Sequence, residues 1–200
     1  MPKDTFNNLS EDKKRRIFDA AVHEFSVRRF SEASINQIVK AAGIPRGSFY
    51  QYFTDKEDIF LYMFTEILNE KREVTRRELV LDQEADVFEI CIQATKVTLA
   101  WSRARPEYSR ISMLMEIDDS EFILKIRDDS AKVLREMIER DKCRGYIKPE
   151  IDSGLIADII YTLIVKEYGW IGLDDNLFMK RINDIINIIK QGITFVYPVE

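Results

Sequence analysis

Two short helical patterns separated by a tight turn occupy residues 34–56, and no other stretch constrains the fold as strongly. Apolar residues recur at helical spacing in the first pattern. They are Ile35, Ile38, Val39 and Ala42. Gly43 lets the backbone reverse, and Pro45 presets the dihedral for a second helix. Because Phe49 and Phe53 are four residues apart, they can share one buried side of that helix.

The second helix is expected to expose a surface rich in hydrogen-bond donors. Its remaining side chains are predicted to face outward or toward the edges. They are Arg46, Ser48, Tyr50, Gln51 and Tyr52. Base edges in the DNA major groove present donor and acceptor patterns that such a surface can read. The pattern therefore favours double-stranded DNA as a partner.

The same stretch resembles the helix-turn-helix of the TetR family of bacterial transcriptional regulators. An alanine–glycine–aliphatic turn is followed by basic–glycine–small–aromatic–tyrosine, then by a later phenylalanine and a Lys–Glu pair. The matching positions are Ala42, Gly43, Ile44, Arg46, Gly47, Ser48, Phe49, Tyr50, Phe53, Lys56 and Glu57. The close match covers roughly the first third of the chain. The rest resembles the family only in length and helical character.

The resemblance implies an all-α chain in two parts. Residues 1–54 would form a three-helix DNA-binding head, and residues 55–200 a helical body for ligand binding and dimerisation. The expected function is that of a cytoplasmic, homodimeric repressor, which a small-molecule effector bound in the body releases from its operator. No cofactor or metal is expected.

Eight residues are predicted to contact DNA, with roles that follow from their chemistry. They are Ser34, Arg46, Gly47, Ser48, Tyr50, Gln51, Tyr52 and Lys56. The expected base readers are Ser48, Gln51 and Tyr52. Tyr50 and Lys56 are expected to hold the DNA backbone, which positions the protein without reading sequence. Arg46 is expected to bind a phosphate or a guanine. Ser34 is expected to cap the first helix of the motif and to touch a phosphate.

Charge is distributed unevenly along the chain. The net charge is −5, but residues 13–53 contain eight Lys or Arg and three acids, so this window carries +5 and the remainder −10. Phosphate binding depends on the local face, and acid elsewhere disfavours nonspecific adhesion to DNA.

Other features of the sequence argue against competing classes. Two cysteines, Cys91 and Cys143, are too few for a disulfide scaffold and are expected to be reduced. The N-terminus has no apolar run typical of a secretion signal, and no window suits a membrane helix. His23, the one histidine, is expected to be a surface or boundary residue of the first helix rather than a base, and multi-histidine metal sites are ruled out. Two alternatives stay open: an all-α interaction protein that does not bind an operator, and an enzyme.

Several local predictions concern helix ends in the first third. Residues 1–9 are expected to be frayed, and Ser10 to cap a first helix that ends near residue 28. The family usually has a glycine where Arg29 stands, so Arg29 would need either a left-handed backbone or a different helix end. The sequence Thr54–Glu57 reads as a capping box that opens a long fourth helix.

The last two helical patterns, at 151–168 and 175–197, are apolar on more than one face. One face can cover the chain's own core, and the other predicts burial against a second chain. The expected dimer interface consists of Ile156, Ile160, Leu163, Ile182, Ile185, Ile186, Ile189 and Ile193.

The resemblance implies that an effector binds inside the C-terminal helical body, which offers aromatic and methionine side chains that could line a pocket. The expected lining is Trp101, Tyr108, Met113, Phe122, Met137 and Tyr161, with Met115 and Trp170 as further candidates. Plain core packing is the alternative for this set. An apolar or amphipathic effector is expected, and its charge stays open.

Overall fold

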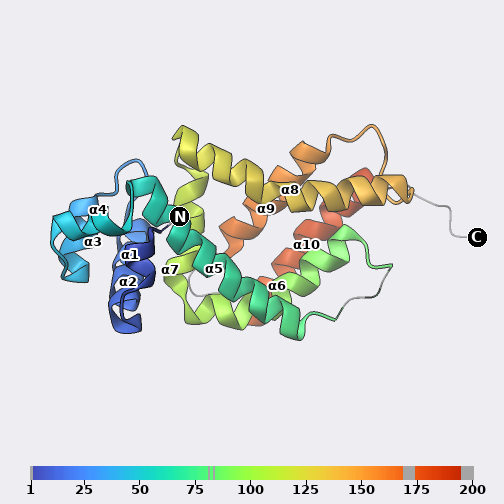
Figure 1. The fold of residues 1–200 in the computed structure, drawn as a ribbon. Helices are drawn as coiled ribbons and strands as arrows, with labels where there is room; N and C mark the ends of the chain where they lie inside the picture. Colours follow the sequence, from blue (N-terminus) through green and yellow to red (C-terminus); the bar gives the residue numbers. More distant parts are fainter. Residues whose placement is uncertain (1, 81, 83, 169–173, 195–200) are drawn as a thin grey trace, which may run out of the picture. The chain divides into compact units, whose positions relative to one another are not determined.

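The computed structural model describes residues 2–80, 82, 84–168 and 174–194. These residues form the helices that Figure 1 labels α1 to α10, and the prediction of an all-α chain is confirmed. The helices are α1 (Asp4–Asn7), α2 (Glu11–Val27), α3 (Ile35–Ala42), α4 (Arg46–Tyr52), α5 (Lys56–Glu78), α6 (Val87–Ala104), α7 (Pro106–Glu116), α8 (Glu121–Cys143), α9 (Ser153–Tyr168) and α10 (Asp175–Ile193).

The chain forms two compact units, and two of their boundaries fall inside helices, in α5 and in α8. The first comprises residues 1–73 and 105–124, and the second residues 74–104 and 125–200. The helix-turn-helix belongs to the first unit. The last pair of helices belongs to the second.

The core of the first unit is built around α2, which packs against both α3 and α7. The predicted stripe on α2 is confirmed, because Ile17, Ala21 and Phe25 are buried. Phe30, shortly after α2, packs its ring edge-on against Phe60 at 5.3 Å and tilted against Phe122 at 4.6 Å. Each such buried ring contributes about 1.5–3 kcal/mol through the apolar surface it removes from water. This aromatic packing fixes the platform on which α3 and α4 rest.

The N-terminal segment is ordered, so the prediction of a frayed end is wrong. Residues 4–7 form α1, and Phe6 is 2% exposed. Its ring lies 5.0 Å from Phe53 and 4.9 Å from Tyr62. The buried Phe6 ring thus helps to dock the segment against Phe53 and Tyr62.

The helix α2 ends at Val27, close to the predicted boundary. Arg28 follows with an extended backbone (φ −137°), and no residue other than glycine has positive φ in the part of the chain that the structure describes. The helix ends without the left-handed turn that a glycine would supply, so Arg29 carries no backbone strain. Ser10 precedes α2 with an extended backbone, but its side chain makes no capping bond, contrary to the prediction.

The capping box of α5 lies one residue later than predicted. The Asp55 carboxylate accepts a hydrogen bond from the Asp58 N–H at 2.9 Å, and the Asp58 carboxylate accepts one from the Thr54 N–H at 3.0 Å. Asp55 and Asp58 therefore take the roles expected of Thr54 and Glu57. Carboxylates also suit the positive end of the helix dipole.

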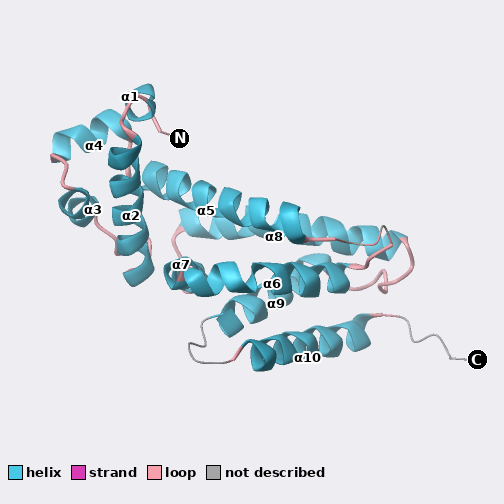
Figure 2. Cartoon of the chain, turned by 90° about the horizontal axis from the view of Figure 1, so that it is seen from below, coloured by secondary structure: helices cyan, strands magenta, loops and turns pink. Residues whose placement is uncertain are grey.

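In the second unit, α10 lies beside α9 and α6 (Figure 2). Most of the predicted dimer residues are buried in this unit's own core. Ile156, Ile160, Ile182, Ile186 and Ile193 are each at most 7% exposed and belong to one cluster with Phe88 and Phe178. They cannot form a surface, so this part of the prediction is wrong.

The other three predicted dimer residues, Leu163, Ile185 and Ile189, are half-buried. The apolar side chains that do face solvent on α9 and α10 include Leu155, Leu177 and Ile188, which are 59%, 42% and 71% exposed. Among the helices searched, which cover the described residues, none is long and apolar enough to cross a membrane.

Candidate DNA-binding surface

The turn between α3 and α4 follows from three residues. The Ser34 side chain caps α3 by accepting from the Asn36 N–H at 3.2 Å, as predicted. Gly43 ends α3 in the left-handed conformation (φ +64°), which costs other residues energy. Pro45 is extended and immediately precedes Arg46, the first residue of α4. It stands one position before the helix rather than in its first turn.

Two buried phenylalanines anchor α4. Phe49 and Phe53 are each 0% exposed, with ring centroids 5.5 Å apart. Arg46, Gly47 and Gln51 are exposed, Ser48 is half-buried, and Tyr50 is 43% exposed. The polar residues predicted to read DNA are thus held on the outer side of a fixed helix, with Tyr52 as the exception.

Tyr52 does not face outward, which contradicts its predicted position. It is 6% exposed, its ring packs 6.2 Å from that of Phe6, and its hydroxyl accepts from the Lys13 ammonium at 3.0 Å. The N-terminal segment covers it. Tyr52 therefore supports the helix and is not placed to read bases.

Lys56 is tied to the protein by its ammonium group. Its Nζ donates to the carbonyls of Phe30 at 2.7 Å, Ala33 at 3.1 Å and Ser31 at 3.3 Å, and it lies 4.6 Å from the centroid of the Phe30 ring. These bonds occupy the donors that a phosphate would need. The structure thus gives Lys56 a role in fixing the turn between α2 and α3, in place of a free phosphate clamp.

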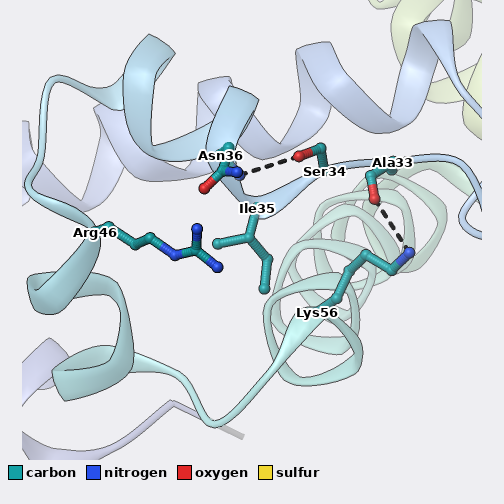
Figure 3. Close-up of a pocket in the computed structure, with 6 residues that line it drawn as sticks. All are labelled: Ala33, Ser34, Ile35, Asn36, Arg46 and Lys56. Carbon is teal, nitrogen blue, oxygen red and sulfur yellow. Dashed lines mark hydrogen bonds between the residues drawn. The ribbon is translucent and has the colours of Figure 1, made fainter.

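A shallow groove of about 300 Å³ separates the starts of α3 and α4. It is lined by Ala33, Ser34, Ile35, Asn36, Arg46 and Lys56. Figure 3 shows the Arg46 side chain extending along this groove toward Ile35. The Arg46 guanidinium makes the groove favourable for an anion such as a DNA phosphate. Asn36 is exposed here and was missed by the sequence analysis, since nothing in its spacing marks it.

Two buried carboxylates fix the segment between α2 and α3. Glu24 is 3% exposed, accepts from the Ser34 N–H at 2.9 Å and pairs with Arg28 at 2.7 Å. Asp118 is 0% exposed and accepts from the Ser31 N–H at 2.8 Å and the Ser31 hydroxyl at 2.9 Å. Together they hold the start of α3, which carries one wall of the groove.

Comparison with known proteins agrees with this geometry. The family model described as "Bacterial regulatory proteins, tetR family" matches residues 17–63. The HTH-type transcriptional regulator YdgC of Bacillus subtilis (strain 168) is 30% identical over 187 residues, which cover 90% of this chain and 92% of YdgC. The fatty acid metabolism regulator protein of the same organism is 34% identical over 193 residues, which cover 90% of this chain and 95% of that protein.

The chain belongs to the TetR family. It is a DNA-binding transcriptional regulator, and its relatives are regulators rather than enzymes. A TetR family regulator from Chloroflexus aurantiacus J-10-FL shares the fold, with a TM-score of 0.74 at 24% identity over 98% of this chain and 100% of that one. The fatty acid degradation regulator FadR from Bacillus halodurans has a TM-score of 0.65 at 20% identity, over 92% of this chain and 97% of its own.

The residues expected to line an effector pocket in this TetR family member fall in both compact units. Tyr108, Met113 and Phe122 belong to the first, and Trp101, Met137 and Tyr161 to the second. Met113 is 36% exposed, which disagrees with an interior position. Phe122 packs on Phe30, Met137 packs on the core of the second unit, and Met115 is buried. Trp170 lies outside the described residues.

Two further predictions concern side chains outside this surface. His23 is exposed on α2. Burial raises the pKa of the Cys91 thiol to about 12, with the nearby Asp86 charge acting in the same direction. A thiol with so high a pKa is a poor nucleophile at neutral pH.

Proposed function

We propose that this TetR family member is a homodimeric repressor that reads two operator half-sites and leaves them when an effector binds. One observation carries the proposal. On α4, Phe49 and Phe53 are fully buried while Arg46, Tyr50 and Gln51 are exposed. A two-fold dimer presents two such helices, to half-sites about 34–36 Å apart or a related multiple.

We assign roles on DNA from chemistry and position. Gln51, through adenine or a bridging water, and Ser48 read base edges. Tyr50 binds the backbone, and Arg46 binds a phosphate at the groove or a guanine. Ser34 and Gly47 lie where the DNA backbone approaches. Lys56 and Tyr52 contribute to DNA binding indirectly, because Lys56 fixes the turn between α2 and α3 and Tyr52 supports α4. We keep the boundary between the two functional domains at residues 54/55, just before α5 begins. The DNA-binding head comes before this boundary, and the effector-binding and dimerisation regions come after it.

The second copy is proposed to cover the outer sides of α9 and α10. Leu155, Ile159 and Leu163 are spaced by four residues on α9, and Leu177, Ile185 and Ile188 recur at helical spacing on α10. These side chains are exposed or half-buried, and Ile159 also packs against the core, where the opposite sides of both helices lie. Exposed apolar stripes of this kind mark interaction surfaces.

The effector is proposed to be an apolar or amphipathic small molecule that binds in residues 55–200. Two proteins similar to this chain are named as regulators of fatty acid metabolism or degradation. Fatty acids are amphipathic, so they are the first class to test. The effector acts only if it binds the DNA-free conformation more tightly than the DNA-bound one.

The decisive experiment measures binding to a duplex selected from a random-sequence library with the parent protein. We expect Arg46→Ala with Tyr50→Ala to weaken binding at physiological salt by about 100-fold, since two contacts of about 1–2 kcal/mol each are lost. Lys132→Ala with Tyr146→Ala removes one basic residue and one tyrosine from exposed positions elsewhere and serves as the matched control. Equal affinity of the double variant and the parent would disprove DNA reading by α4.

Titrating saturated fatty acids into the complex of the parent protein with the selected duplex tests whether an effector releases the DNA.

A further inference from the structure

The last turn of α4 leaves backbone carbonyls that the helix itself cannot satisfy. This helix has seven residues, and its last turn contains no basic side chain to complement the negative end of the helix dipole. Such a short helix is unstable by itself. The carbonyls of Tyr50, Gln51 and Tyr52 therefore need donors from elsewhere.

The N-terminal segment supplies those donors from almost fifty residues away in sequence. The Lys3 ammonium donates to the Tyr50 carbonyl at 2.8 Å, and the Lys3 N–H donates to the Tyr52 carbonyl at 2.9 Å. The Thr5 hydroxyl donates to the Gln51 carbonyl. Three successive carbonyls at the end of α4 are thus satisfied by two residues, one of which also brings a positive charge to the negative helix end.

The segment that makes these bonds is itself anchored. Phe6 is 2% exposed and packs against both Tyr52 and Phe53. The Phe6 N–H donates to the Lys3 carbonyl at 2.8 Å, so the backbone between the anchor and the donors is folded into a turn. Figure 2 shows the resulting position of α1 beside α4, in agreement with the contacts between these helices.

We propose that residues 3–6 are a positioning clamp that fixes the end of α4 and thereby sets how precisely Gln51 and Tyr50 meet DNA. The inference rests on the proposed function. Gln51 is exposed, but its own carbonyl is held by Thr5, and the neighbouring Tyr50 carbonyl is held by Lys3. The clamp acts on the backbone of the reading residues and leaves their side chains available. It makes the N-terminal segment a determinant of operator specificity.

A direct phosphate contact by Lys3 is the alternative, and it has a different signature. A lysine that neutralises a phosphate contributes to binding on every sequence, and its loss lowers the salt slope of binding by about one. A lysine that positions α4 contributes on the cognate sequence and leaves the salt slope unchanged. The two roles are separable with one pair of duplexes.

The experiment compares the full-length parent with Lys3→Met/Thr5→Val, which removes both side-chain donors and keeps the Phe6 anchor. Lys14→Met is the control, because Lys14 pairs with Glu11 and also loses one positive charge near the N-terminus. Hydrogen exchange is followed in peptides covering residues 46–53. Binding is measured on the selected duplex and on a scrambled duplex of equal length, over a range of KCl concentrations.

We expect faster exchange in residues 46–53 for the double variant only. We also expect binding to the selected duplex to weaken about three- to tenfold, the effect of losing two modest hydrogen bonds, with little change on the scrambled duplex and an unchanged salt slope. The single variant Lys3→Arg keeps Thr5 and a positively charged donor at position 3, so it should exchange and bind DNA like the parent.

Three results would overturn the clamp. They are unchanged exchange in residues 46–53, faster exchange with parent affinity on the selected duplex, and uniform loss on both duplexes with a lower salt slope. If the parent selects no duplex at all, the proposed function fails. Hydrogen exchange would still decide whether residues 3–6 hold the end of α4.

Discussion

The carboxylate of Asp118 joins segments 87 residues apart in the sequence by accepting two hydrogen bonds from Ser31. Burial opposes its ionisation, but hydrogen bonds from Ser120 and Ser31 outweigh burial and lower the pKa of Asp118 to about 2. The partner was not predictable, because nothing local in sequence indicates that Ser31 lies within reach.

Asp118 should contribute stability that depends on pH. Because its folded pKa lies below the ordinary value of 3.8, the ionised form favours the folded state. The contribution, up to about 2 kcal/mol, is complete above pH 4 and is lost as pH falls toward 2. We expect Asp118→Asn to lower the free energy of unfolding at pH 7, with the difference from the parent shrinking between pH 4 and pH 2. Exposed Asp119→Asn is the control. A difference that persists unchanged at pH 2 would contradict the assignment.

At the scale of single helices, periodicity predicted which sides are buried, and it failed where a distant segment covers a side chain. Phe49 and Phe53 were predicted correctly because their spacing alone gives α4 a buried side. Tyr52 was predicted to be exposed, yet Phe6 and Lys13 cover it. Likewise, the spacing of acids around Thr54 fits two capping registers. Only the structure shows that Asp55 and Asp58 form the box.

The two glycines of the helix-turn-helix should behave in opposite ways when replaced by alanine. At Gly47 a Cβ would meet no protein atom within 4 Å, and the residue lies inside α4, so Gly47→Ala should stabilise folding by about 0.5–1 kcal/mol. The same methyl would stand between the backbone and DNA, so binding to the selected duplex should weaken about tenfold. Thermal unfolding and anisotropy titration measure the two effects.

Gly43→Ala is the matched comparison for this prediction. Its φ of +64° strains any other residue, although a Cβ there also has open space. We expect a loss of about 1 kcal/mol in stability. Parent-like DNA binding by Gly47→Ala would show that the α4 backbone does not approach DNA closely.

At the scale of the whole molecule, the sequence indicated that α9 and α10 are apolar on two sides, but it could not show which side is interior. Hydrophobicity is the same for a residue that faces the chain's own core and one that faces a partner. The structure separates them, since Ile182 and Ile186 are fully buried while Ile188 is 71% exposed. The interface proposed here therefore keeps the half-buried Leu163 and Ile185 from the sequence analysis and adds exposed residues beside them, such as Leu155 and Ile188.

This reassignment makes a prediction about assembly. If the outer sides of α9 and α10 meet a second copy, the double variant Leu155→Glu/Ile188→Glu places charges in an apolar interface. The variant should therefore be a monomer, whereas the parent should be a dimer of about 47 kDa, twice the 23.5 kDa of one chain. Val80→Glu adds charge at another exposed apolar residue, 90% exposed, and should leave the dimer intact. Sedimentation equilibrium at micromolar concentration measures the mass. Because each of the two substituted side chains is more than half exposed in the single chain, helix content should be unchanged by circular dichroism. A double variant that stays dimeric would place the interface elsewhere.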